Sequence, residues 1–154
     1  MTKTAKFALA VLVCVPIALA EDMGVARKMS ENKFAPLPNL PACITLAVQS
    51  GDPSKGAFVI LFKGTAGCSI PWHWHTPIEH VMIVSGSVKV EMKGGATSIL
   101  GPASYTMMPS KHVHQFTCIS ACTAFLTSNA AFDIHYVDAN GTEIPTEQAL
   151  AKKK

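Results

Sequence analysis

The stretch that decides the fold is Gly67-Cys-Ser-Ile-Pro-Trp-His73-Trp-His75-Thr-Pro-Ile-Glu79. It reads as one strand, and successive residues of a strand point to opposite faces. His73 and His75 therefore project to the same side, and Glu79 joins them if the alternation continues through Pro77. Three side chains that can bind a divalent metal on one face predict a metal site.

A second extended segment, Pro109-Ser-Lys-His112-Val-His114, carries further imidazoles. An adjacent strand could bring His114 across the sheet to the first segment. Nitrogen ligands disfavour Mg and Ca and suit a divalent transition ion, namely Mn, Fe, Co, Ni, Cu or Zn. The sequence therefore predicts such an ion as cofactor, with four ligands: His73, His75, Glu79 and His114.

About ten short segments rich in Val, Ile, Thr and Phe are separated by Gly, Pro, Ser or Asn. They span residues 44–48, 58–63, 70–75, 81–84, 88–92, 97–100, 105–108, 112–117, 123–127 and 133–137. No helical pattern of any length is visible. Short strands with frequent turns favour an all-β sandwich or barrel.

Residues 67–86 resemble the first motif of the cupin family. That motif is a Gly, five residues, His-x-His, three or four residues, Glu, six residues and a Gly, and this sequence fills every fixed position. The resemblance covers roughly residues 42–137. It implies a jelly-roll β-barrel of the cupin type, with a metal held in its lumen by the matching residues, which are the four ligands named above.

The second cupin motif is matched more loosely. Pro109 and His114 stand at its Pro and His positions. Ala103 and Lys111 replace its two glycines, and Cys118 replaces its final Asn. These departures leave the ligand in place and alter the glycine positions of the turn before it.

His112 is the predicted catalytic residue. It lies two residues before His114, so both side chains point to the same face of an extended strand. His112 is therefore expected to point inward near the mouth of the lumen. An imidazole titrates near neutrality and can donate or accept a proton there. The alternative is a partly exposed residue in the turn before His114.

The surroundings of the site are expected to be apolar. Candidate lumen residues are Val81, Ile83, Tyr105, Met107 and Phe116. Those on the strands that carry the ligands are assigned because they alternate in step with the ligands, and the others are assigned without such an argument. Residues expected outside the lumen are Trp72, Trp74, His80 and His135. No arginine follows Arg27, so a clamp for phosphate or carboxylate would need lysine or the metal itself. This argues against sugar-phosphate isomerases and enzymes of dicarboxylates.

Residues 1–20 predict a cleavable secretory signal peptide. Lys3 and Lys6 precede an apolar run over residues 7–17, and Ala18-Leu19-Ala20 supplies a small-x-small site before Glu21. The predicted location is therefore periplasmic or secreted. An alternative is lipidation at Cys14, although Val13 stands where a small residue is preferred.

Without the signal peptide, eleven basic side chains face ten acidic ones, and three of the basic ones are Lys152-Lys153-Lys154. The rest of the chain is nearly neutral and lacks the excess of basic residues that is typical of proteins that bind nucleic acid. The expected partner is a small-molecule ligand or substrate, with no membrane span after cleavage, and a homodimer is possible.

Four cysteines remain after signal cleavage: Cys43, Cys68, Cys118 and Cys122. An even number in an exported chain suggests disulfides, with three possible pairings. A hairpin turn over residues 119–121 would join Cys118 to Cys122 and leave Cys43 with Cys68. Free buried thiols are the alternative.

The expected organisation is a signal peptide over residues 1–20, an irregular arm over 21–41, a cupin β-barrel over 42–140 and a tail over 141–154. The first functional hypothesis is an exported metal-dependent cupin, an oxygenase or other oxidoreductase acting on a small apolar or phenolic molecule. The second is a non-catalytic module of the cell envelope that binds a metal or small ligand. Fold alone does not select between them.

Overall fold

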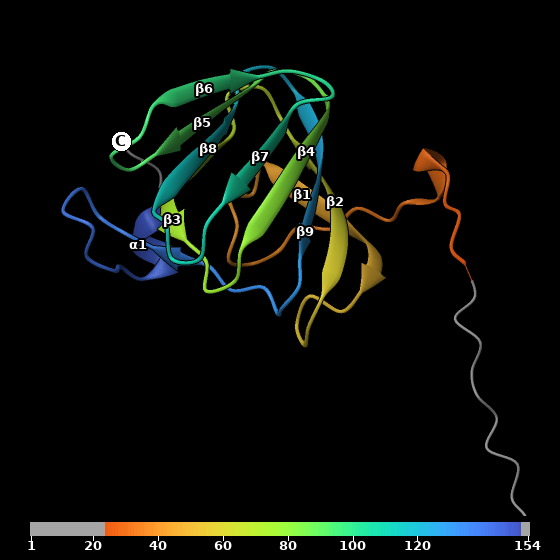
Figure 1. Cartoon of the computed structure of the whole chain (residues 1–154), viewed down its shortest axis with the longest axis horizontal. Coiled ribbons are helices and arrows are strands. Elements are labelled where there is room, and N and C mark those ends of the chain that lie inside the picture. The colour runs from red at the N-terminus through yellow and green to blue at the C-terminus, as the bar shows by residue number, and fades with distance from the viewer. Residues whose placement is uncertain (1–23, 152–154) are drawn as a thin grey trace, which may run out of the picture.

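The structure, a computed structural model, describes residues 24–151. The predicted signal peptide and the three C-terminal lysines lie outside the described residues. The described residues form ten strands, preceded by the short 3-10 helix η1 (Met29–Glu31) and followed by the helix α1 (Thr146–Leu150). Figure 1 shows their arrangement. The strands are β1 (Ile44–Gly51), β2 (Phe58–Gly64), β3 (Ser69–Trp74), β4 (Glu79–Ser85), β5 (Val88–Met92), β6 (Thr97–Leu100), β7 (Tyr105–Met108), β8 (His114–Cys118), β9 (Cys122–Ser128) and β10 (His135–Tyr136). Among residues 24–151, no helix is long and apolar enough to cross a bilayer.

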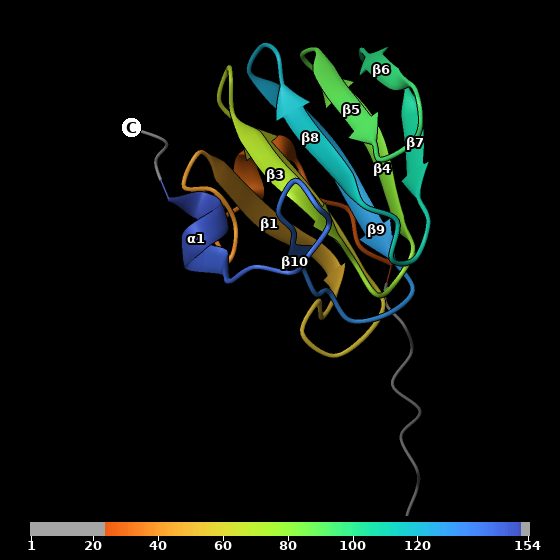
Figure 2. The same cartoon turned by 90° about the vertical axis from the view of Figure 1, so that its left-hand side faces the viewer.

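The strands form two five-stranded sheets in which every pairing is antiparallel. The first sheet has the order β1-β2-β9-β4-β7, and the second has the order β10-β3-β8-β5-β6. Figure 2 shows β3, β8 and β5 of the second sheet running alongside one another. The expected class is confirmed as mostly β, in the form of a two-sheet sandwich.

The core lies between the sheets because alternate residues of each strand point inward. In β9, buried and half-buried residues alternate without a break from Cys122 to Ser128, and β8 shows the same alternation. Inward side chains from both sheets form one apolar cluster, in which Phe62 of β2 meets Phe116 of β8 edge to face at 5.5 Å. Burial of this apolar surface drives the two sheets together.

The stretch from Gly67 to Glu79 is not one strand, which corrects the prediction. β3 ends at Trp74 in the second sheet, and β4 begins at Glu79 in the first sheet. Pro77 lies in the connection, where it has no N–H to offer a ladder. Glu79 therefore reaches the interior because the two sheets face each other, and not because a single strand alternates.

The altered glycine positions of the second motif keep the backbone conformation that glycine adopts easily. Ala103 has φ 65° and Lys111 has φ 59°, both in the left-handed region. The N–H of Lys111 donates to the carbonyl of His75 at 2.8 Å. The turn before His114 is thus tied to the end of β3 despite the lost glycine.

Two disulfides join Cys43 to Cys68 and Cys118 to Cys122, which confirms the preferred pairing. The second bridge spans the connection between β8 and β9. The first ties the start of β1 to the start of β3, in the two different sheets. Two disulfides in so small a domain hint at an oxidising compartment.

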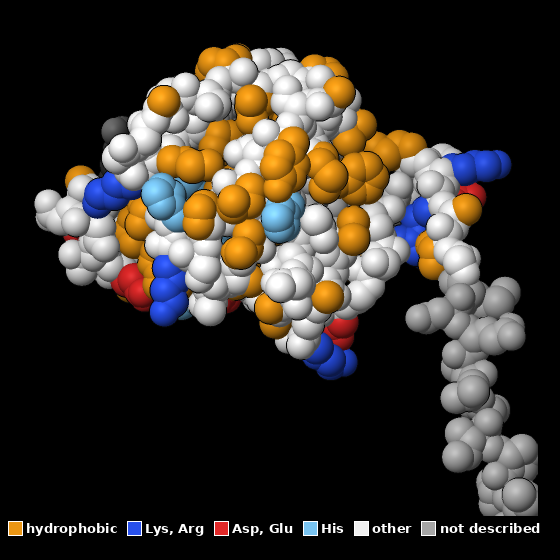
Figure 3. Space-filling view, viewed as in Figure 1, with side chains coloured by type: hydrophobic (Ala, Val, Ile, Leu, Met, Phe, Trp, Pro, Cys, Tyr) orange, Lys and Arg blue, Asp and Glu red, His pale blue; other side chains and the backbone are white. Residues whose placement is uncertain are grey.

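The outer face of the first sheet carries an apolar row across all five strands. Successive partners in register are Ala47, Leu61, Phe125, Met82 and Tyr105. Figure 3 shows hydrophobic side chains gathered over this part of the molecule, around β4 and β7.

Tyr105 and Met107 belong to this outer face, with exposed fractions of 57% and 40%, so their assignment to the lumen was wrong. The register explains the error. Met108 pairs with Glu79 and is buried, so residues at odd spacing from it on β7 point outward.

Candidate metal centre

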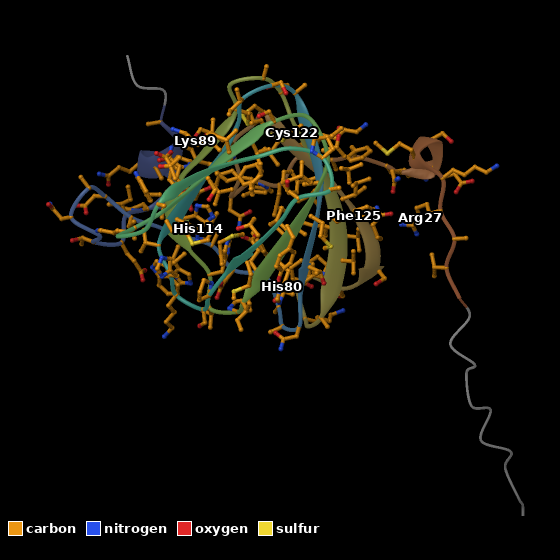
Figure 4. All side chains as sticks on the ribbon, turned by 45° about the horizontal axis from the view of Figure 1, so that its top comes forward. Arg27, His80, Lys89, His114, Cys122 and Phe125 are labelled. Carbon is orange, nitrogen blue, oxygen red and sulfur yellow. A yellow bond between two sulfur atoms is a disulfide. The ribbon has the colours of Figure 1, made fainter. Side chains whose placement is uncertain are left out.

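Three buried histidines meet between the sheets. His73 on β3 and His114 on β8 are direct partners in register, and His75 follows the last residue of β3. One ring nitrogen from each lies within 4.8 Å of the others. The exposed fractions are 2%, 4% and 1% for His73, His75 and His114. Figure 4 shows His114 inside the sandwich.

Backbone carbonyls fix the tautomer of all three rings. Each Nδ1 lies within hydrogen-bond distance of a carbonyl oxygen, which can only accept, so each Nδ1 carries the proton. The acceptors are Pro71 at 2.7 Å for His73, His112 at 2.9 Å for His114, and Asp133 for His75. Each neutral ring therefore has its lone pair on Nε2.

Glu79 completes the cluster from the opposite sheet. Its carboxylate oxygens lie 3.6 Å from Nε2 of His75 and 3.4 Å from Nε2 of His114. Neither of these Nε2 atoms has a hydrogen-bond partner, although both are fully buried. A buried polar atom without a partner is costly and calls for an explanation. A bound cation would satisfy both nitrogens and the carboxylate together.

The charge states suit such a site. Burial holds the pKa of His73 well below its ordinary value, and the neighbouring His114 and His75 lower it further. For Glu79, burial alone would raise the pKa. The proximity of His75 and His114 outweighs that effect, so the pKa is lowered. A neutral imidazole beside an ionised carboxylate is the form in which both bind metals.

The cluster opens into a small apolar cavity between the sheets. Its volume is about 30 Å³, with room for about two water molecules. Apart from the cluster, the lining is apolar: Leu40, Ile44, Leu46, Ile60, Phe62, Ile70, Val81, Phe116, Leu126, Phe132 and Ile134. Val81 and Phe116 lie where the sequence predicted, whereas Ile83 is buried in the core without lining the cavity.

His112 is not among the residues that line the cavity. The alternation argument does not apply to it, because β8 begins only at His114. Its Nε2 is buried without a partner, and its carbonyl orients His114. The structure thus gives His112 a contact with the cluster through its backbone.

The four side chains expected outside the lumen, Trp72, Trp74, His80 and His135, do not line the cavity. Trp74 stacks on His135 with ring centroids 3.9 Å apart and planes 3° apart. His80 meets the Tyr105 hydroxyl at 2.6 Å on the outer face of the first sheet. Trp72 is half-buried on the outside of the second sheet.

Sequence reasoning missed the connection between β9 and β10. Phe132 and Ile134 from this connection line the cavity, and the carbonyl of Asp133 between them accepts from His75. The available signal was one acidic residue between two apolar ones. It does not reveal a partner 58 residues away in the chain.

No family model matches this sequence, and a comparison with curated proteins finds no match. Solved structures do match. An RmlC-like cupin from Shewanella frigidimarina aligns with a TM-score of 0.59 and 12% identity, over 68% of this chain and 89% of that one. The chain has the cupin fold.

Two enzymes share this cupin fold. The polyketide cyclase RemF from Streptomyces resistomycificus aligns with a TM-score of 0.66 and 17% identity, over 83% of this chain and 99% of that one. An acetylacetone dioxygenase from Acinetobacter johnsonii aligns with a TM-score of 0.61 and 22% identity, over 86% and 94%. At such identities the likeness establishes the fold, and function must be argued from the site.

Proposed function

We propose that the histidine cluster holds a divalent transition metal, with His73, His75, Glu79 and His114 as ligands. The observation that carries this proposal is the pair of buried Nε2 atoms, on His75 and His114, that face Glu79 without any hydrogen-bond partner. Backbone carbonyls hold the opposite ring nitrogens and aim the lone pairs inward, an arrangement common around metal-binding imidazoles.

The proposed activity is oxidation of a small apolar or phenolic molecule. A bound transition ion would supply Lewis-acid or one-electron chemistry. The chain's own residues line the cavity with an apolar wall, and no arginine is among them to hold an anionic substrate. The shared fold of the acetylacetone dioxygenase also supports this class of reaction.

A second candidate is a non-catalytic metal-binding module. The cavity volume of about 30 Å³ favours it, because that space suits an ion with a water molecule better than an organic substrate. Oxygen uptake and product formation with a panel of diketones and phenols separate the two candidates. An enzyme turns over at least one compound, whereas a binding module gives saturable metal binding without product.

Metal content tests the proposed ligands directly. His75→Ala and His114→Ala are expected to lose most of the bound metal and to remain folded, because strands from both sheets hold the cavity wall. His80→Gln is the matched control, since this imidazole lies on the outer face. Elemental analysis and thermal unfolding are measured on the same preparations. Full occupancy in either alanine variant means that the ligands are elsewhere.

The catalytic role of His112 stays a prediction. If its ring transfers a proton to or from the substrate, His112→Gln lowers turnover by about 10²- to 10⁴-fold and keeps the metal. A backbone role alone predicts activity close to wild type, because the carbonyl that orients His114 remains.

Action outside the cytoplasm is part of the proposal. The charged start and the small-x-small site of residues 1–20 support export, and the two disulfides agree with an oxidising compartment. The intact mass of the exported protein should correspond to a chain that starts at Glu21. A product that retains residues 1–20 or carries lipid on Cys14 would contradict this.

A further inference from the structure

Asp133 lies in the connection between β9 and β10, which closes one end of the cavity. Its neighbours Phe132 and Ile134 both line that cavity. The N–H of Phe132 donates to the carbonyl of Pro53 at 2.7 Å, and its ring meets that of His75 with centroids 5.2 Å apart. Nothing in the sheet ladders fixes residue 133 itself, so its position depends on its own contacts.

Asp133 holds the end of β3 at two points. Its carbonyl oxygen accepts from Nδ1 of His75, and its carboxylate Oδ1 accepts from the N–H of Thr76 at 2.7 Å. The two bonds join one residue to two consecutive residues of the opposite segment. Together they determine where the carbonyl sits relative to the His75 ring.

The other carboxylate oxygen is held from outside. Oδ2 of Asp133 lies 3.5 Å from Nε2 of His135, whose ring stacks on Trp74. Hydrogen bonds from Thr76 keep the pKa of Asp133 below its ordinary value in spite of partial burial, which itself raises it. The side chain is therefore an ionised acceptor at neutral pH.

We infer that Asp133 is the positioning residue for His75, because its side chain anchors the loop whose carbonyl aims Nε2 of His75 at Glu79. This inference rests on the proposed metal site and deepens it. Without the anchor to Thr76, the carbonyl is free to leave Nδ1. The His75 ring can then rotate or take the tautomer with the proton on Nε2, and in that tautomer Nε2 cannot bind a metal.

Asp138 provides a matched control. Its Oδ1 accepts from the N–H groups of Asn140 and Thr142, both at 2.9 Å, so it also anchors a connection through the backbone. It makes no hydrogen bond to the histidine cluster. Loss of Asp138 therefore reports what a merely structural acidic anchor contributes.

The experiment titrates Co²⁺ into chelator-treated protein and follows visible absorption and affinity. Asp133→Ala keeps the backbone carbonyl and removes the anchor to Thr76, so the carbonyl can leave Nδ1 of His75. Losing such an outer partner of a metal ligand weakens binding by about 10- to 100-fold, and we expect Co²⁺ affinity to fall in this range. Asp133→Asn keeps an oxygen for the Thr76 N–H and is expected to stay within about threefold of wild type. Asp138→Ala should also stay within about threefold. Wild-type affinity in Asp133→Ala overturns the inference.

A second readout needs no metal. Long-range ¹H–¹⁵N spectra of the metal-free protein report the tautomer of each imidazole. We expect His75 to carry its proton on Nδ1 in the wild type and in Asp133→Asn, and to lose that preference in Asp133→Ala. If the alanine variant does not fold, Asp133→Leu, which has a larger apolar side chain and no acceptor, takes its place.

The two readouts separate failure of the inference from failure of the proposed function. A wild-type protein that binds no Co²⁺ but shows the Asp133-dependent tautomer of His75 refutes the metal site and supports the positioning role. A His75 proton on Nε2 in the wild type, or a tautomer unaffected by Asp133→Ala, overturns the inference whether or not metal binds.

Discussion

Ala103 and Lys111 show at the scale of single residues how this chain departs from the cupin motif without losing its geometry. Both adopt positive φ at positions where the motif has glycine. A side chain in this region crowds its own backbone, at a cost of about 1 to 2 kcal/mol per residue. The match to the second cupin motif located the two substitutions. It did not show whether the turn would change its conformation or keep the positive φ angles with a side chain in place.

Glycine at either position is therefore expected to stabilise the protein. Ala103→Gly and Lys111→Gly should each raise the free energy of unfolding by about 1 kcal/mol, after allowance for the greater freedom of glycine in the unfolded chain. Gly67→Ala is the opposite control, because Gly67 has φ 76° and open space around an added Cβ. Urea unfolding should show a loss in this control and a gain in the other two.

His73 predicts how stability depends on pH. Its pKa in the folded protein lies well below the ordinary 6.5, with burial as the main cause. Between these two values the unfolded chain binds a proton that the folded chain does not, so stability falls as the pH is lowered below 6.5. The slope for one such group is at most about 1.4 kcal/mol per pH unit.

Urea unfolding of the metal-free protein from pH 8 to about pH 5 tests this expectation. The curve should be flat near pH 8 and fall below 6.5. Glu79 adds to the fall only below its ordinary pKa of 4.5, because its pKa is also lowered in the folded state. In His73→Gln, the free energy of unfolding should depend little on pH above the range in which Glu79 contributes. An unchanged slope in this variant contradicts the assignment to His73.

At the scale of elements, the existence of each strand was predicted better than its bounds: β8 begins at His114 and not at His112, and β10 covers only His135–Tyr136. All ten expected strands exist, since alternation and turn residues are local signals. The prediction of one strand from Gly67 to Glu79 was wrong, because it continued the alternation through Pro77, which lies in the connection between β3 and β4. Sheet membership could not be read from that segment, because it depends on which distant strands β4 joins.

The two disulfides should contribute unequally. Their cysteines are separated by 25 residues in Cys43–Cys68 and by 4 in Cys118–Cys122. In the chain-entropy model these loops give about 3.5 and about 2 kcal/mol, since the longer loop restricts the unfolded chain more.

Each bridge can be measured alone. Replacing one pair with alanines leaves the other, and the unfolding free energies of the oxidised and reduced forms then differ by that remaining bridge. We expect the larger difference in the variant that keeps Cys43–Cys68. The reverse order would show that effects in the folded state outweigh loop closure.

The homodimer that the sequence leaves possible can be tested at the scale of the whole molecule. Ala47 and Leu61 of the outer row are buried, whereas Met82 and Tyr105 are exposed and Phe125 is partly exposed. The accessible part of the row contains no charged side chain. The ammonium group of nearby Lys63 lies over the Phe34 ring, with Nζ 4.1 Å from the ring centroid. Arg27 lies beside Leu61 and Phe125 at one edge of this face. A twofold contact places the same surface on itself, so like-charge repulsion is avoided where the contact is centred on Met82 and Tyr105. We therefore expect a homodimer, where one forms, to use this part of the face.

Light scattering after size-exclusion chromatography measures the mass in solution. If the wild type is a dimer, Met82→Lys should shift it to a monomer. Ile99→Lys is the control, because Ile99 is 61% exposed on β6 of the other sheet. A monomeric wild type rejects the dimer, and a dimeric Met82→Lys variant places the contact elsewhere.

Local sequence determined the strands, the short disulfide loop between Cys118 and Cys122, and the grouping of His73, His75 and His114 on the inner side of the second sheet. These follow from side-chain alternation, from two cysteines near one turn, and from the spacing of a motif. The strands and the short disulfide loop involve residues close in the chain. The grouping of the histidines involves one strand pair, β3 and β8, in which both strands carry a motif histidine.

Tertiary structure alone decided that Glu79 approaches from the opposite sheet, that Tyr105 and Met107 face outward, and that Asp133 holds His75. Each depends on strand register or on a contact between residues far apart in the chain. A shift of register by one residue exchanges the two faces of a strand, and only the packing of the complete core selects between them.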